Sequence, residues 1–480
     1  MVALLKKPAL QSLKMPDVVR HPFRLAYVMV ALALCVALVL GAATPVLVDL
    51  MNGSIAKVMA LPAAMLFGLL LIYDRKLTLL LIVALRAGAD NVLELTRFSL
   101  GGYMVGIGGV INAIVILLAI LLIFERPKVM PRPAYMAWVP FLLITAVGVV
   151  HSPFVGESVR LFLQQLSYFS LFIGGYYCVR DQVDFRFCLK LMVWSSLIPV
   201  LYAFVDIALH FNGEFRLRST FAHPNIMAFY LTVIITVAFY LLKTMPTKNT
   251  LGTRTVLVGY LLLMLLMLLL TKTRSAWGAT ATGFAVYALL FDRRFLAYML
   301  VMGVIALFIP GVGDRILDLG QGNEVATYAT LNSFAWRVYL WESGLSWMSP
   351  MNYLWGQGLQ TFYENSINFF PLAGNIKWGA HSVYVQLLFE LGAIGLLAFL
   401  WQSLSLVKQL WALVRIDKLA AFSLIVIIAN FLICSVSDNM FYYLSYNWYL
   451  WFVIGAGCAL GRSVVLAQPK KAAVPPGTEH

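Results

Sequence analysis

The chain has 480 residues, of which 61% are hydrophobic and only 12% are charged, and its mean hydropathy is +0.86. Soluble domains are about half apolar and about a quarter charged, so this composition excludes a soluble enzyme and a disordered chain. The net charge of +14 does not indicate nucleic-acid binding, because most of the excess Lys and Arg lies in short loops between apolar runs. The sequence predicts an all-α polytopic membrane protein.

Apolar runs follow one another along the whole chain. A membrane-spanning helix needs roughly 20 mostly apolar residues. Runs that meet or approach this length lie near 24–42, 55–73, 76–90, 103–124, 134–150, 158–179, 186–209, 222–242, 254–270, 275–291, 294–311, 382–407, 419–437 and 444–462. Those at 76–90 and around 254–291 are short enough to be broken or re-entrant, so we expect about 12 (12–14) spans.

Lys and Arg in the short loops set the orientation, because cytoplasmic loops carry the excess of these residues. The bias is satisfied when both chain ends lie in the cytoplasm. We therefore predict four parts: an N-terminal transmembrane bundle (1–311), a large periplasmic loop (312–380), C-terminal transmembrane helices (381–465) and a disordered cytoplasmic tail (466–480).

The stretch 312–380 is too long for a simple connection, and loops of this length usually carry function or their own structure. Residues 332–348 are predicted to form an amphipathic helix with Phe334, Val338, Trp341 and Leu345 on its apolar stripe. Such a helix can lie on the membrane surface as a lid.

Several cations lie at the outer face, against the positive-inside bias: Arg160, Arg216, Arg218, Lys272, Arg274, Arg315, Arg337 and Lys377, together with His223 and His381. Each one alone is compatible with a snorkelling side chain or a lipid-headgroup contact. Because five outer segments contribute Arg, and Arg binds phosphate in a bidentate way, together they indicate a site for a lipid phosphate or diphosphate.

Individual positions leave alternatives open. Arg160 shares a helix face with Gln164 and Ser167, which is typical of either a polar site or helix packing. His223, next to Pro224, is a ligand contact or, as we favour, a structural residue at the start of a helix.

His381 and Tyr384 lie one turn apart at the outer end of a span. A histidine at a helix N-terminus is kept neutral by the helix dipole, as a general base must be, although simple capping is the alternative. Glu390, deeper in the same span, is expected to be paired structurally. No clustered carboxylates or nucleotide-binding motif indicates a metal, a cofactor or ATP.

Five motifs stand out together: RSTFAHPN, TRSAW, WRVYLW, WGQGLQTFY and, most specific, HSVYVQLLFELGAIGLL. They resemble the O-antigen ligase family of bacterial membrane glycosyltransferases, which belongs to a superfamily shared with O-antigen polymerases and protein O-oligosaccharyltransferases. The resemblance covers most of the chain from about Arg160 to Gly395, with Ser382 where many members have Asn.

The resemblance implies about 12 transmembrane helices in the bacterial inner membrane, with a large periplasmic loop. It also implies metal-independent transfer of preassembled O-antigen from undecaprenyl diphosphate to lipid A–core, which completes lipopolysaccharide. His381 matches the family's loop histidine, and Arg218 and Arg337 match its periplasmic arginines. Further contacts to the diphosphate or glycan are predicted for Arg160, Arg216, Arg274, His223 and Tyr384.

Three other readings stay open. An O-antigen polymerase would use the same site with a second lipid-linked glycan as acceptor, and a protein O-glycosylating transferase would use a polypeptide. A lipid or polysaccharide transporter is the alternative from a different class, but the chain lacks the paired, symmetric segments that are common in transporters.

Overall fold

The computed structural model describes residue 66 and residues 68–96, 98–100, 103–212, 215–246, 251–308, 312–313 and 333–467. The chain divides into two compact units, Met1–Phe67 and Gly68–His480. Nearly all of the first unit, with the expected span at 24–42, lies outside the described residues. So do most of the expected span at 55–73, Arg315 and the predicted tail from residue 468.

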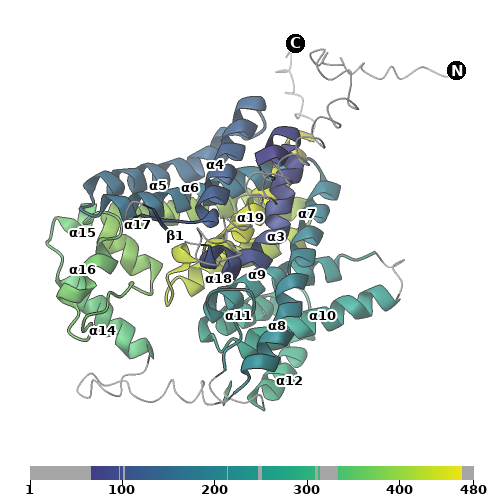
Figure 1. The fold of residues 1–480 in the computed structure, drawn as a ribbon. Coiled ribbons are helices and arrows are strands. Elements are labelled where there is room, and N and C mark those ends of the chain that lie inside the picture. The colour runs from purple at the N-terminus through teal and green to yellow at the C-terminus, as the bar shows by residue number, and fades with distance from the viewer. Residues whose placement is uncertain are drawn as a thin grey trace, which may run out of the picture. The chain divides into compact units, whose positions relative to one another are not determined.

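The described residues of the second unit form helices, apart from one short hairpin and the loops between these elements (Figure 1). Its N-terminal half contains α3 (Arg75–Leu95), β1 (Phe98–Leu100), β2 (Tyr103–Val105), α4 (Ile107–Glu125), α5 (Arg132–His151), α6 (Val155–Cys178), α7 (Gln182–Ser195), α8 (Leu197–His210) and α9 (Pro224–Lys243). Its C-terminal half contains α10 (Leu251–Leu270), α11 (Arg274–Leu290), α12 (Phe295–Leu307), α14 (Ser333–Ser346), α15 (Asn352–Trp355), α16 (Thr361–Phe369), α17 (Val383–Trp411), η4 (Ala412–Arg415), α18 (Lys418–Cys434), η5 (Met440–Tyr442) and α19 (Leu444–Ala467).

The predicted helical fold class is confirmed, and the hairpin corrects one boundary. The expected apolar helix at 103–124 begins only at Ile107, because Tyr103–Val105 pairs antiparallel with Phe98–Leu100. Gly106, between β2 and α4, has the extended backbone of an N-cap.

Six helices of the described part are long and apolar enough to cross a membrane. They are α4, α5, the nearly continuous pair α7–α8, α9, α10 and the run from α17 through η4. Helices α12 and α18 are apolar but shorter. Helices of this length and composition indicate a multi-pass membrane protein. The total of about 12 spans and the division into four parts stay predictions.

Helices α6 and α19 pack with their backbones almost in contact. A Cβ on Gly175 would lie 2.0 Å from the carbonyl oxygen of Phe452, and one on Gly455 would lie 2.0 Å from that of Phe172. Small residues allow such close packing between helices in membranes, where van der Waals contact replaces the hydrophobic effect as the driving force. This pair is therefore the closely packed centre of the bundle.

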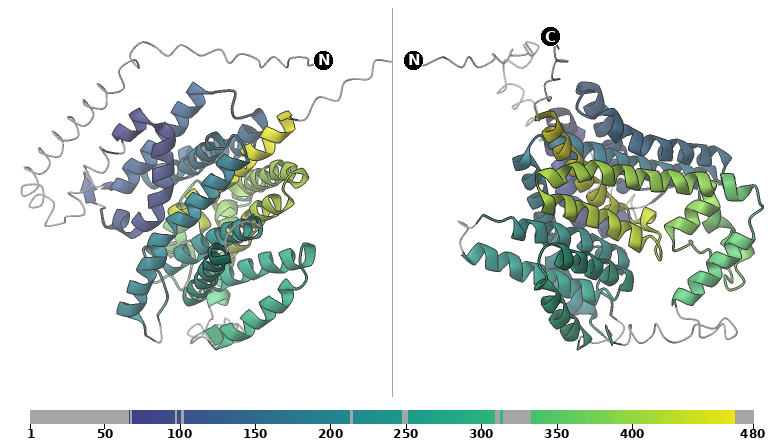
Figure 2. Two further views of the ribbon diagram at one scale, coloured as in Figure 1. Left: turned by 90° about the vertical axis from the view of Figure 1, so that its right-hand side faces the viewer. Right: turned by 180° about the vertical axis from the view of Figure 1, so that it is seen from behind.

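Helices α14, α15 and α16 form a lobe at one end of α17, as the right view of Figure 2 shows. Its core consists of Leu340, Met348, Phe362, Phe369, Phe370, Ala373, Ala380 and Phe389. Because Phe389 belongs to α17, the lobe is packed directly onto that helix. The predicted helix at 332–348 is confirmed as α14, but the apolar stripe was partly wrong. Phe334 is 49% exposed, whereas Leu340 and Gly344 are buried, because the lobe core lies on their side.

The lobe crosses α17 where two glycines meet. At Gly392 α17 is interrupted by φ 66°, and a Cβ there would lie 2.2 Å from the Leu354 carbonyl oxygen. At Gly356 a Cβ would lie 2.3 Å from the Glu390 carbonyl oxygen. The motifs WGQG and ELGAIG therefore share one structural purpose, which is to let two backbones touch.

The backbone carbonyl oxygens next to the interruption of α17 accept hydrogen bonds from the lobe. Gln357 N donates to the carbonyl oxygen of Phe389 at 3.0 Å, and Gly358 N donates to that of Glu390 at 2.9 Å. The buried Glu390 side chain accepts from Gln386 Nε2 at 3.2 Å. The expectation that Glu390 is paired structurally is confirmed.

Candidate functional site

The loop from Phe215 to His223 is fixed by a buried carboxylate. The backbone N–H groups of Arg218 and Ser219 donate to Oδ2 of Asp206 at 3.1 and 2.9 Å, and Asp206 is only 4% exposed. Ser219 has φ 54°, and its hydroxyl donates to the carbonyl oxygen of Pro199. A carboxylate that accepts two successive N–H groups holds a turn that regular structure would not provide. This turn leaves the Arg218 side chain exposed.

His223 is the N-cap of α9, which confirms the structural role that its position before Pro224 suggested. Its Nδ1 accepts from the backbone N–H of Asn225 at 3.1 Å. In the neutral ring this places the proton on Nε2. Burial and the neighbouring charge of Arg216 lower the pKa of His223. The ring is therefore held in one orientation at the start of the helix.

Asn225 joins three parts of the chain. Its Oδ1 accepts from Nη2 of Arg216 at 2.8 Å and from Oγ1 of Thr273 at 3.2 Å. Its Nδ2 donates to Oδ2 of Asp438 at 2.8 Å. The Tyr443 hydroxyl donates to the other oxygen of Asp438. The loop before α9, the start of α11 and the loop before α19 thus meet in one polar network.

Asp438 is a buried carboxylate in this network, and it is 2% exposed. Burial raises its pKa, while the bonds from Tyr443 and Asn225 and the charge of Arg337 act in the opposite direction. The sequence analysis missed this residue. The available signal was an acidic residue directly after the apolar run 419–437, at the outer end of a span.

His381 lies just before the N-cap of α17, with φ 48°. Its ring packs edge-on against Trp336 at 6.2 Å, and the preceding carbonyl, of Ala380, accepts from Nε1 of Trp341 at 2.6 Å. Burial, followed by the charges of Arg337 and His223, lowers the pKa of His381 to about 4. The imidazole is therefore neutral at pH 7, as the sequence analysis predicted, although burial rather than the helix dipole is the main cause.

Arg337 acts electrostatically on both His381 and Asp438. It lies on α14, so the lobe contributes a cation to a site whose other members come from the membrane bundle. The structure thus brings the predicted residues Arg216, His223, Arg337 and His381 together with the unpredicted Asn225 and Asp438. We call these six residues the rim cluster.

The other predicted residues have different surroundings. Arg160 is 55% exposed and lies 3.7 Å from Glu157 on its own helix. The Tyr384 hydroxyl donates to the carbonyl oxygen of Leu432 at 2.8 Å, so it is engaged in helix packing. Arg274 is the first residue of α11 and directly follows Thr273 of the Asn225 network.

The side chains on the predicted polar stripe of α6 are also engaged in packing. Gln164 Nε2 donates to the Tyr168 hydroxyl and to the Phe441 carbonyl oxygen, and Ser167 accepts from Trp448 Nε1.

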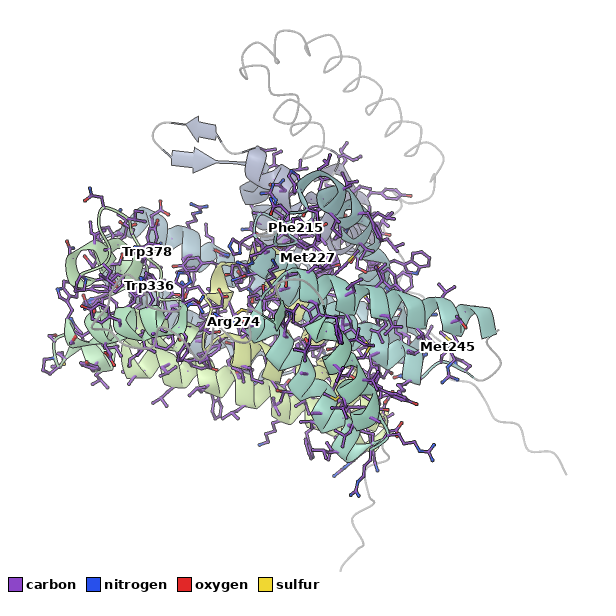
Figure 3. All side chains as sticks on the ribbon, turned by 90° about the horizontal axis from the view of Figure 1, so that it is seen from below. Phe215, Met227, Met245, Arg274, Trp336 and Trp378 are labelled. Atoms are coloured by element: carbon purple, nitrogen blue, oxygen red, sulfur yellow. The ribbon has the colours of Figure 1, made fainter. Side chains whose placement is uncertain are left out.

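In the view of Figure 3 the labelled Arg274 lies between Trp336 and Trp378 of the lobe and Met227 at the start of α9.

Within the described ranges, no group of three or more His, Cys, Asp and Glu side chains could hold a metal ion. The fold and the rim cluster define a multi-pass helical membrane protein with a cationic site where a lobe meets the ends of its helices.

We compared the chain with models of known protein families. Residues 259–400 match the family model described as O-antigen ligase. The predicted resemblance is therefore confirmed over residues 259–400, a segment that includes Arg274, Arg337 and His381. No curated protein sequence matches the chain.

Proposed function

We propose that this protein is an O-antigen ligase. It transfers preassembled O-antigen polysaccharide from undecaprenyl diphosphate to a sugar hydroxyl of lipid A–core, at the periplasmic face of the bacterial inner membrane. The observation that carries the proposal is the buried His381, whose pKa is lowered, next to the charge of Arg337. A base and a fixed cation in one partly buried place suit the displacement of a diphosphate by a hydroxyl.

In the proposed reaction, the acceptor oxygen attacks the anomeric carbon as the bond from that carbon to the diphosphate oxygen breaks. The hydroxyl proton passes to His381, and undecaprenyl diphosphate leaves with the bonding electrons. Arg337 and Arg218, assisted by Arg216, Arg160 and Arg274, stabilise the charge that develops on the leaving group. One direct displacement inverts the anomeric configuration. Neither a metal nor ATP is needed in this scheme.

A histidine with a pKa of about 4 is a weak base in the free protein. Binding of the donor would make His381 a stronger base. A bound diphosphate places negative charge next to Arg337 and His223, which opposes the electrostatic part of the pKa depression at His381. The base would therefore gain strength when its substrate is in place.

The test uses purified protein in detergent with EDTA and no nucleotide. The donor is an undecaprenyl-diphosphate-linked glycan and the acceptor is rough lipopolysaccharide. We expect a ladder of glycan-bearing lipopolysaccharide, and the H381A variant should not produce it. If lipopolysaccharide stays unmodified while the donor glycan lengthens on its carrier, the protein is a polymerase and the ligase proposal is wrong.

A further inference from the structure

The short helix α15 exposes an apolar surface that the lobe does not cover. Met351, Leu354 and Trp355 are 66%, 46% and 60% exposed, whereas Trp336 and Trp378 of the same lobe pack against its core. These three residues, which we call the foot, belong to the stretch that the sequence analysis assigned to a periplasmic loop. Adjacent exposed apolar side chains indicate a contact surface.

Backbone hydrogen bonds fix the height of the foot against two long helices. Gly358 N donates to the Glu390 carbonyl oxygen on α17, and Leu359 N donates to the Gly148 carbonyl oxygen on α5 at 3.0 Å. At Gly392 the backbone of α17 touches that of Leu354 in the foot. The foot therefore lies level with Gly148 and Gly392.

Both helices carry an exposed cation at the far end, and these ends are level with one another. Arg132 begins α5 and Lys408 lies near the end of α17, and Gln409 Nε2 donates to the Pro133 carbonyl oxygen at 3.1 Å. At 1.5 Å per residue, Gly148 lies about 24 Å from Arg132, and Gly392 lies the same distance, about 24 Å, from Lys408.

The hydrocarbon layer of a bilayer is about 30 Å thick, so with the cations at one boundary the foot lies about 6 Å inside the other. Any tilt of the helices would bring it closer to the centre. The foot also continues an apolar surface: Val147 and Val150 on α5 and Leu397 on α17 are 66%, 86% and 64% exposed.

We infer that the foot inserts into the bilayer and anchors the lobe there, with lipid hydrocarbon chains as its partner. The depth, the exposed apolar side chains and the continuity with the surfaces of α5 and α17 all support this partner. Tryptophan is also the side chain that favours the membrane interface. The lobe that carries Arg337 is then tied at a fixed height above the lipid, where a lipid-linked diphosphate would lie.

The test measures depth with a nitroxide on single cysteines in proteoliposomes, in a chain whose five native cysteines are replaced by alanine. W355C and M351C report the foot, and both positions are exposed, so each substitution removes little packing. L397C is the lipid-facing reference, and N375C, at an exposed polar position of the lobe, is the water-facing reference.

We expect the foot labels to resemble L397C, with several-fold more relaxation by oxygen than by a water-soluble nickel chelate. Behaviour like that of N375C would overturn the inference. Shielding from both reagents would overturn it too, because it would mean that protein covers the foot. Since depth does not depend on glycosyl transfer, a negative result with active protein would leave the proposed function standing.

Discussion

Asn225 Nδ2 donates a 2.8 Å hydrogen bond to Oδ2 of Asp438, although 213 positions separate the two residues. The loop that contains Asp438 also supports the start of α17, next to His381, because the Ser435 carbonyl oxygen accepts from Val383 N at 2.9 Å. The first turns of α9 and α17, which follow His223 and His381, are therefore held by one segment. The relative position of the two histidines depends on that segment rather than on either helix alone.

This relationship predicts that Asp438→Ala impairs transfer. The change removes the acceptor for Asn225 and Tyr443, and a hydrogen bond to a charged group contributes about 1.5–3 kcal/mol. If one such bond is lost from the transition state, kcat/KM should fall roughly 10- to 150-fold. Initial rates of lipopolysaccharide extension would measure this.

A matched control lies at the opposite end of α18. Asp417 accepts from the Tyr240 hydroxyl at 2.7 Å and from Gln182, and it caps α18. Asp417→Ala removes similar bonds far from the rim cluster, so it should lower thermal stability while folded protein keeps its kcat. Equal losses of kcat in the two variants would show that Asp438 is only structural.

His381→Ala should reduce kcat by about 10² to 10⁴-fold, the range of a general base, with little change in membrane expression. His151, an exposed histidine at the end of α5, is the control, and His151→Ala should retain activity. Normal smooth lipopolysaccharide in cells that carry only H381A would remove His381 from the mechanism.

The role of the Arg337 charge can be tested by comparing substitutions that keep the charge with substitutions that remove it. Arg337→Lys keeps the cation but loses the bidentate fork, so it should retain more activity than Arg337→Ala. Because Arg337 lowers the pKa of His381, the alanine variant should also raise that pKa toward its ordinary value of 6.5. Histidine acylation followed over pH by mass spectrometry would detect the shift. An unchanged profile would mean that burial alone sets the pKa.

The pH dependence should differ between the free and donor-bound protein. The acidic limb of kcat/KM for the donor reports His381 in the free protein, so it should lie at about pH 4. The limb of kcat reports the complex, and the bound diphosphate favours the imidazolium, so that limb should lie at a higher pH. Coincident limbs would contradict a diphosphate bound next to His381.

The lowered pKa of His381 also predicts how protein stability depends on pH. The folded pKa of His381 is lower than its ordinary value, so folding favours the neutral ring. Its contribution to the free energy of unfolding is full above pH 6.5 and is lost as the pH falls through about 4. H381A should therefore lose less thermal stability than the parent over this interval.

The sequence predicted the helices well because apolar runs are a local signal. The run at 134–150 became Arg132–His151, and the run at 222–242 became Pro224–Lys243. The expected gathering of cations at the outer face rests on the charge bias, which is a count over loops, and it stays a prediction. His381 was singled out because its motif is local and specific.

The sequence could not predict how distant segments pair. Asp438 carries no motif and becomes part of the site only when the loop before α19 folds against Asn225. The buried face of α14 was misjudged because the lobe core, rather than the helix's own periodicity, decides which side is covered. The membrane contact that we infer for the foot has no signal in the sequence, because three apolar residues are too few to stand out as an apolar run.

The last prediction concerns the crossing of α15 and α17. Gly392→Ala would place a methyl group 2.2 Å from the Leu354 carbonyl oxygen, at a residue whose φ is 66°. With ψ −171°, this backbone conformation is essentially restricted to glycine and costs another residue about 1–3 kcal/mol, and the neighbouring atom is backbone that cannot rotate away. We expect a clear loss of folded protein after detergent extraction, measured by monodisperse yield and thermal midpoint. Gly303→Ala in α12, where a Cβ would meet nothing within 4 Å, is the control and should be neutral or slightly stabilising. If G392A extracts and melts like G303A, the two backbones do not touch there, and the depth argued for the foot loses its support.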